Sequence, residues 1–264
     1  LTIDEGMACF TNGFRLTESS NLAVTGLGGL AMSNCVLSVG GNVTIQNSVL
    51  TWGPATYPSA RSFLYAVPAS SYSVAGNFSL TGGKLYLYNG GTNILALNVA
   101  SNVTFTNYAR VYVQSAVTNP GGPDYGALMD VKKTMLIGDQ SWVYPLSDWT
   151  NGGSPFFSVG NLTVSTTNSG ISADSGGFRG GHAGHYAGYG PGFGGSSGSG
   201  SGGGGGYGGP GGTYGGGLGG STYGFTNAPV DPGSGGGALA AGGRGGGLVR
   251  IEAANAISLD GTLS

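Results

Sequence analysis

A glycine-rich tract at residues 176–224 constrains the fold of this chain more than any other feature. It holds 27 glycines in 49 positions, among them the uninterrupted run from Gly202 to Gly206. Glycine loses more backbone freedom on ordering than any other residue, so such a tract would ordinarily be a flexible linker. Flexible linkers are poor in aromatic residues, whereas this tract contains Phe178, Tyr186, Tyr189, Phe193, Tyr207, Tyr214 and Tyr223. We therefore expect an ordered structure in which glycine lets neighbouring backbones pack closely.

An extended left-handed helix with about three residues per turn is the conformation that suits this tract. Because such a helix has no internal hydrogen bonds, its N–H and C=O groups point outward and can bond to neighbouring helices. Collagen is excluded, since it needs glycine at every third position, and the register through Gly177 and Gly180 ends at Ala183. We therefore predict a bundle of polyglycine II helices in this part of the chain.

Short apolar–polar–apolar runs characterise the first 175 residues, and a sustained helical period is lacking. Such alternation is typical of half-buried strands, and the Gly, Asn and Ser residues between the runs favour turns. One phrase, a turn followed by a strand, recurs from Gly41, Gly76, Ser101 and Gly160, at intervals of 35, 25 and 59 residues. Irregular repeats of this kind predict a solenoid whose coils differ in loop length.

The predicted fold is all-β: an irregular right-handed parallel β-helix with an ordered glycine-rich insertion. A β-sandwich is the alternative, because many short strands are typical of that fold too. We expect a β-solenoid over residues 1–175, the glycine-rich insertion over 176–247 and returning solenoid strands over 248–264. In the repeated phrase, eight apolar side chains should face one lumen: Val43, Ile45, Phe78, Leu80, Val103, Phe105, Leu162 and Val164.

Charged residues form only 8% of the chain, 9 basic and 11 acidic, about a third of the usual share. No basic surface is expected to hold phosphates, so nucleic acid is not a predicted partner. A near-neutral surface favours self-association. No run of 18 apolar residues predicts a membrane span. The chain starts at Leu1 without a signal peptide, so we expect a processed protein or a segment of a longer one.

Candidate catalytic groups are sparse. Polysaccharide lyases and hydrolases with β-helical folds use clustered carboxylates or a basic residue beside calcium, whereas the acidic residues here are scattered singly. Only Asp4 and Glu5 are adjacent, and neighbours on a strand face opposite ways. His182 and His185 would lie about 9 Å apart in a three-fold helix, too far to share a metal. We therefore predict no enzyme, cofactor or metal site.

Other candidate sites are modifications and sugar contacts. Cys9 and Cys35 are either buried apolar residues or a disulfide between neighbouring layers. The repeated phrase contains four N-x-Ser/Thr sequons, which are candidate N-glycosylation sites: Asn42, Asn77, Asn102 and Asn161. Five aromatic residues in segments predicted to be loops are candidates for stacking on sugar rings: Trp52, Trp142, Trp149, Tyr125 and Tyr144.

Five short phrases in the last hundred residues resemble a pattern of secreted glycine-rich β-helix surface proteins, which are bacterial with looser relatives in plants. They are Ile171-Ser172-Ala173-Asp174, Gly190-Pro191-Gly192, Gly233-Ser234-Gly235-Gly236-Gly237, Gly245-Gly246-Gly247-Leu248-Val249-Arg250-Ile251 and Asp260-Gly261-Thr262-Leu263-Ser264. The flanking strand phrases are the more specific part of the match. The resemblance implies an extracellular, surface-attached or fibre-forming role and implies no catalytic residue.

Neither end of the predicted solenoid has a polar cap. Leu1-Thr2-Ile3 begins a strand, and Gly261-Thr262-Leu263-Ser264 stops within one. Open solenoid ends expose unpaired strand groups, and head-to-tail contacts that do not close make an open filament. The sequence therefore favours a structural subunit of an extracellular filament or sheath, with itself as partner. The alternatives are an adhesin or stalk segment that binds carbohydrate and, less favoured, a polysaccharide-degrading enzyme.

Overall fold

The computed structural model describes residues 1–264 except 12, 27, 33–34, 48, 53–70, 89–94, 119–120, 198–200, 226, 228 and 239. The described residues contain strands and no helix. The strands form one sheet of 12 strands and one of 8 strands. The pairings between named strands are all parallel.

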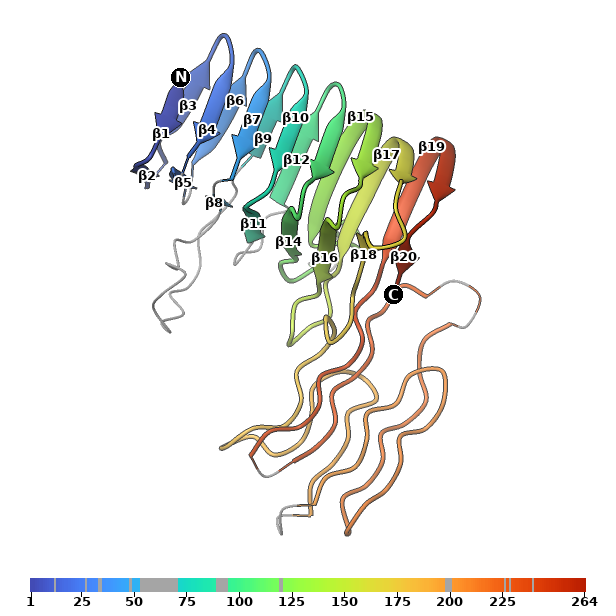
Figure 1. Ribbon diagram of the computed structural model, residues 1–264. Helices are drawn as coiled ribbons and strands as arrows, with labels where there is room; N and C mark the ends of the chain where they lie inside the picture. The colour runs from blue at the N-terminus through green and yellow to red at the C-terminus, as the bar shows by residue number, and fades with distance from the viewer. Residues whose placement is uncertain are drawn as a thin grey trace.

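Each of the first twelve strands pairs with the strand three places later in the chain, so three consecutive strands make one coil. The first three coils comprise β1 (Thr2–Asp4), β2 (Met7–Phe10), β3 (Arg15–Glu18), β4 (Leu22–Thr25), β5 (Gly29–Met32), β6 (Val36–Val39), β7 (Val43–Gln46), β8 (Val49–Trp52) and β9 (Ser71–Val74). Figure 1 shows the coils side by side, from β1 at one end to β19 at the other.

The remaining strands differ in length, and three of them have ten or eleven residues. They are β10 (Phe78–Thr81), β11 (Lys84–Tyr88), β12 (Leu95–Val99), β13 (Val103–Thr106), β14 (Arg110–Gln114), β15 (Ala127–Ile137), β16 (Trp142–Leu146), β17 (Pro155–Val164), β18 (Gly170–Ile171), β19 (Arg250–Leu259) and β20 (Thr262–Leu263). The first part of β15 pairs with β12 and its last part pairs with β13. Its pairing with β17 shifts register between Val131 and Thr134. Because β15 joins β12 to β13, the larger sheet curls back on itself, an arrangement compatible with a β-helix or solenoid.

The hydrophobic core runs along the inside of the coils. The eight apolar side chains of the repeated phrase are at most 1% exposed and belong to one buried cluster, as predicted. The polar residues between them, such as Thr44 and Ser79, are exposed or half-buried. Phe78 and Phe105 pack edge to face between coils, with ring centroids 6.4 Å apart. A β-sandwich would place antiparallel strands in two facing sheets, and the named strands of the described residues contain no antiparallel pair.

The glycine-rich part leaves the coils after β18 and returns to them at β19 (Figure 1). Its backbone folds into extended segments that reverse direction repeatedly. Several reversals contain glycines with positive φ, such as Gly184 at 89° and Gly216 at 88°. The segments are residues 177–182, 185–190, 192–197, 201–207, 209–214, 217–223, 233–238 and 242–247. We call this set of segments the glycine bundle.

Candidate assembly surfaces

The sequon asparagines form a ladder along one corner of the coils. The backbone N–H of Asn77 donates to Oδ1 of Asn42 at 2.8 Å, and that of Asn102 donates to Oδ1 of Asn77 at 3.1 Å. The side-chain amides of Asn77 and Asn102 donate to the same oxygens at 3.3 and 3.1 Å. Asn161 continues the line through Thr134, whose Oγ1 lies 3.5 Å from Nδ2 of Asn161. Hydrogen bonding between coils therefore explains why the phrase recurs.

The ladder has one more member that the sequon pattern did not reveal. Oδ1 of Asn21 accepts the backbone N–H of Asn42 at 2.7 Å, but Ala23 stands where a sequon needs Ser or Thr. The glycine of the phrase also has a packing role. A Cβ atom on Gly76 would lie 2.5 Å from Oδ1 of Asn42 and 2.6 Å from the carbonyl oxygen of Gly41.

Glycosylation of the four sequons stays a prediction. Asn42 and Asn77 are exposed, whereas Asn102 and Asn161 are half-buried. The disulfide also stays a prediction: Cys9 is exposed on β2, and Cys35 is buried just before β6.

The two histidines lie closer together than the sequence predicted. Their ring centroids are 5.8 Å apart, because the chain reverses between them at Gly184. The backbone of His182 donates to the carbonyl of His185 at 2.7 Å and accepts the reverse bond at 2.8 Å. Tyr189 stacks on His185, with ring centroids 4.4 Å apart. Within the described residues, no group of three or more metal-ligating side chains forms.

Most of the candidate sugar-binding aromatics are on strands or packed against neighbours. Trp142 and Tyr144 lie on β16 rather than in a loop, so that prediction was wrong. Tyr144 belongs to a stack with Tyr112 and Tyr86, with successive centroids 4.9 Å apart. Trp149 packs against the Arg179 guanidinium at 5.0 Å. Neighbouring groups therefore cover ring faces of Tyr144 and Trp149, which indicates packing rather than an open sugar platform.

Two further aromatic candidates complete this group. Tyr125 lies beside Phe156, with ring centroids 5.1 Å apart and planes tilted by 44°. Trp52 ends β8, and its side chain lies outside the described part of the structure.

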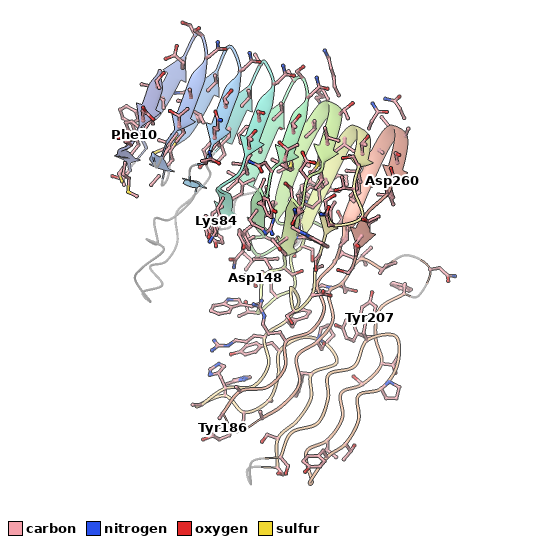
Figure 2. The ribbon with its side chains drawn as sticks, viewed as in Figure 1. Phe10, Lys84, Asp148, Tyr186, Tyr207 and Asp260 are labelled. Atoms are coloured by element: carbon pink, nitrogen blue, oxygen red, sulfur yellow. The ribbon has the colours of Figure 1, made fainter. Side chains whose placement is uncertain are left out.

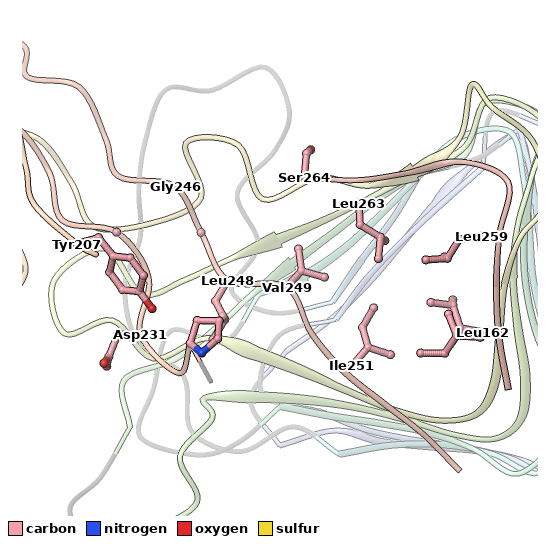
Figure 3. A pocket seen from close by; sticks show the side chains of 14 residues that line it. Leu162, Tyr207, Asp231, Gly246, Leu248, Val249, Ile251, Leu259, Leu263 and Ser264 are labelled. Atoms are coloured by element: carbon pink, nitrogen blue, oxygen red, sulfur yellow. The ribbon is translucent and has the colours of Figure 1, made fainter. Parts of the chain in front are cut away.

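The coil formed by the end of β19 and by β20 presents apolar side chains to solvent. Ile257, Leu259 and Leu263 are 50%, 45% and 42% exposed. They line a cavity of about 670 Å³ together with Leu162, and their side chains point into the same space (Figure 3). Leu162 and Val164, which pair with Ile257 and Leu259 one coil earlier, are fully covered. The lumen-facing side chains of this coil are therefore exposed.

The coil at the other end, β1 to β3, is also incompletely covered. Met7 is 58% exposed, and Phe10 lies at the end of the coils opposite Asp260 (Figure 2). Lumen-facing residues of this coil are only partly buried against the core: Ile3, Ala8, Phe10 and Leu16. Both terminal coils thus expose apolar surface together with strand edges.

Residues 233–238 lie at the centre of the glycine bundle. Their backbone groups hydrogen-bond to five other segments, whereas a strand within a flat sheet bonds to two neighbours. Five N–H groups of this segment donate to backbone carbonyls at 2.8–2.9 Å. The donor and acceptor residues are Gly233 and Gly246, Gly235 and Tyr189, Gly236 and Gly243, Gly237 and Gly203, and Ala238 and Tyr186. In the other direction, Gly233, Gly235 and Gly236 accept from Phe178, Gly194 and Gly181 at 2.9–3.1 Å.

Ser234 fixes this central segment to its surroundings. Its side chain is buried, accepts the N–H of Gly192 at 3.0 Å and donates to the Tyr223 hydroxyl at 2.9 Å. The Tyr223 hydroxyl in turn donates to the carbonyl of Pro232 at 2.5 Å. Burial raises the pKa of Tyr223 above its usual value. The serine of the Gly-Ser-Gly-Gly-Gly phrase is therefore a structural residue, a role that glycine counting alone did not indicate.

The space around the glycines repeats every three residues. An added Cβ atom on Gly242 or Gly245 would overlap a backbone carbonyl of residues 233–238. On Gly243 and Gly246, the next residues along, it would have no atom within 4 Å apart from the chain neighbours. A strand alternates with a period of two, so the three-residue period distinguishes these segments from β-strands.

The described residues contain no helix of the length and hydropathy that a membrane span needs. The resemblance to secreted glycine-rich β-helix surface proteins remains a prediction from the sequence phrases. Comparison with known proteins finds no matching family model, no matching curated protein and no matching solved structure.

Proposed function

We propose that this protein is a structural subunit of an extracellular filament or sheath that assembles head to tail. The uncovered lumen faces of the two terminal coils carry the proposal. Stacking one copy's β19–β20 coil on another copy's β1–β3 coil would cover Ile257, Leu259 and Leu263 and continue the parallel sheets. The two faces are different surfaces, so the contact is heterologous and does not close on itself.

In this proposal the coils form a right-handed parallel β-helix and the glycine bundle consists of polyglycine II helices. The hand follows from the general preference of parallel strand connections for right-handed crossovers. Two observations support polyglycine II: hydrogen bonds from one segment to five neighbours, and a Cβ environment that repeats every three residues. Both are expected of a helix with three residues per turn and outward-pointing peptide groups.

Self-association is also supported by the charge and apolar surface of the chain. Only 20 of 264 residues are charged at neutral pH, so little electrostatic repulsion opposes contact between copies. Burying apolar surface contributes roughly 25 cal/mol per Å², and specific interfaces generally bury more than about 1,000 Å². The terminal coils offer both apolar side chains and strand edges for such a contact.

Negative-stain microscopy of the purified protein tests the proposal, with Leu263→Asp as the disrupting variant. Leu218→Asp is the matched control, because Leu218 is 71% exposed on the glycine bundle, away from the terminal coils. We expect long uniform fibres from the unmodified protein and from Leu218→Asp, and no long fibres from Leu263→Asp. A monodisperse monomer at high concentration, for the unmodified protein, would overturn the proposal.

An adhesin that binds carbohydrate is the second candidate function. Exposed aromatic rings favour it: Tyr214 on the glycine bundle is 72% exposed, and Phe225, just after residues 217–223, is 70% exposed. Aromatic faces are suited to stacking on sugar rings. Glycan-array binding by a monomeric protein, lost in Tyr214→Ala, would support this function; binding that persists in Tyr214→Ala would remove its basis.

A further inference from the structure

The neighbours of residues 233–238 form an incomplete ring. Going round the central segment, residues 242–247 bond to 177–182, which bond to 185–190; residues 185–190 bond to 192–197, which bond to 201–207. Parallel cylinders of equal width pack with six neighbours, and only five places are filled here. Between residues 201–207 and 242–247, no backbone hydrogen bond is found in the described part of the chain.

A groove of about 530 Å³ occupies the sixth place. One wall is Gly202–Tyr207, the other is Gly243–Gly246, and the floor is the central segment at residues 233–237. Gly204, Gly243 and Gly246 are exposed along it. The groove therefore has the direction of the surrounding segments. Eleven of its lining residues are glycines, and the others are Tyr207, Ser234 and Arg244, whose guanidinium donates to the Gly177 carbonyl at 3.2 Å.

The groove also has unused hydrogen-bonding capacity. Among the described residues, no acceptor is found for the N–H groups of Gly243 and Gly246, and no backbone partner for the peptide groups of Gly205. Contacts within the chain do not require glycine at positions 243 and 246, because a Cβ atom there would meet open space. The lack of side chains at these positions leaves room for a partner outside the chain.

We propose that the groove binds an extended glycine-rich segment of a second copy of this chain, which completes the six neighbours of residues 233–238. This inference rests on the proposed function and adds a lateral contact to it. The chemistry of the occupant follows from the five segments already present, which are glycine-rich, extended and bonded through their backbones. A segment with larger side chains would not approach this closely.

Residues 209–214 are the segment that fits this role. Among the described residues, the backbone partners of this segment lie only in residues 201–207 and 217–223, so the segment is at the edge of the bundle. Gly209 and Gly212 are exposed, and an added Cβ atom on either would again meet no atom within 4 Å. The groove of one copy and the edge of the next are different surfaces, so repeated contacts extend an assembly sideways.

Valine substitutions in the groove and on the edge test this contact. We expect Gly243→Val and Gly246→Val to keep the thermal unfolding midpoint of the unmodified protein, while the fraction that sediments as lateral bundles falls at least tenfold. Gly212→Val should do the same from the opposite surface. Ser197→Val is the control, because Ser197 is exposed at a reversal outside the groove, and it should leave sedimentation unchanged.

Cross-linking gives an independent measurement. In a Cys9→Ser background, Gly243→Cys protein mixed with Gly212→Cys protein should form an intermolecular disulfide under mild oxidation, whereas Ser197→Cys mixed with Gly212→Cys should not. Discrete cross-linked dimers without fibres would support the groove and overturn the filament. If fibres form, the valine variants leave sedimentation unchanged and no cross-link appears, the groove contact is overturned and the filament is not. Loss of glycan binding in Gly243→Val, without any cross-link, would assign the groove to sugar and also overturn it.

Discussion

Oδ1 of Asn42 accepts two hydrogen bonds from Asn77 in the next coil, one from its backbone N–H at 2.8 Å and one from its side-chain amide at 3.3 Å. The same relationship links Asn77 to Asn102. Each asparagine oxygen thus replaces a backbone carbonyl at a corner where the sheets are interrupted.

Removing this oxygen should destabilise the coils. We expect Asn42→Ala to lower the free energy of unfolding by about 1 kcal/mol, because the Asn77 N–H loses its acceptor and hydrogen bonds contribute about 0.5–1.5 kcal/mol each. Asn42→Asp keeps an acceptor oxygen and should lower the free energy of unfolding by less than Asn42→Ala does. Both variants destroy the sequon, so a loss caused by missing glycan would be equal in the two. Urea unfolding of each variant measures the difference.

Neighbouring glycines in the bundle should respond in opposite ways to the same substitution. Gly242→Ala places a methyl group against the carbonyl of Gly236, and we expect a loss of about 1–3 kcal/mol or more from overpacking. Gly243→Ala meets open space and should be neutral or stabilise by up to about 1 kcal/mol, because alanine restricts the unfolded chain.

Gly245→Ala and Gly246→Ala form a second matched pair with the same expectation. Calorimetry or denaturant unfolding of the four variants measures the contrast. Equal losses within each pair would contradict a three-residue repeat and would favour a period of two or a loosely ordered tract.

Assembly should depend little on salt. Ionic strength screens contacts between exposed charges, with a Debye length of about 30 Å at 0.01 M and about 3 Å at 1 M salt. The lumen-facing side chains of the terminal coils are apolar, so we expect similar pelleted fractions at these two concentrations. A sharp fall in pelleted protein at high salt would instead indicate charge-dependent contacts.

Stability should fall steeply above pH 10. Burial, with a smaller contribution from Tyr86 and Tyr112, raises the pKa of Tyr88 to about 12. A raised pKa means that the folded state favours the protonated phenol. This contribution is therefore fully present below pH 10, and about 2 kcal/mol of it is lost by pH 12. Tyr88→Phe should flatten the stability profile between pH 10 and 12, whereas Tyr214→Phe, at an exposed site, should not.

The coils were predictable because their signal is local. Alternation fixes which face of a strand is apolar, so Phe78 and Leu80 were expected inside and Ser79 outside, as found. The repeated Gly-Asn phrase located the corner. Asn21 was not identified as part of the ladder because Ala23, two residues later, departs from the repeated phrase, although the hydrogen bond requires only the asparagine.

Features that depend on how distant segments meet were not predictable. The predicted separation of His182 and His185 assumed that a continuous helix joins them, whereas a reversal at Gly184 brings the two rings together. Trp142 was expected in a loop, yet pairing with Arg110 and Gly170 in neighbouring coils places it on a strand. In a tract with so many glycines, composition does not distinguish Gly242, which has no room for a methyl group, from Gly243, which has.

The two ends of the glycine bundle meet where it joins the coils, since the Gly247 N–H donates to the carbonyl of Ala173 at 2.7 Å. A pulling force along the coils passes directly from β17 to β19 through their paired backbones. The glycine bundle lies outside the path of this force, so it is not stretched until the pairing of β17 with β19 breaks. Tension in a fibre would then leave its shape unchanged, and a break between β17 and β19 would release the folded bundle as extra length.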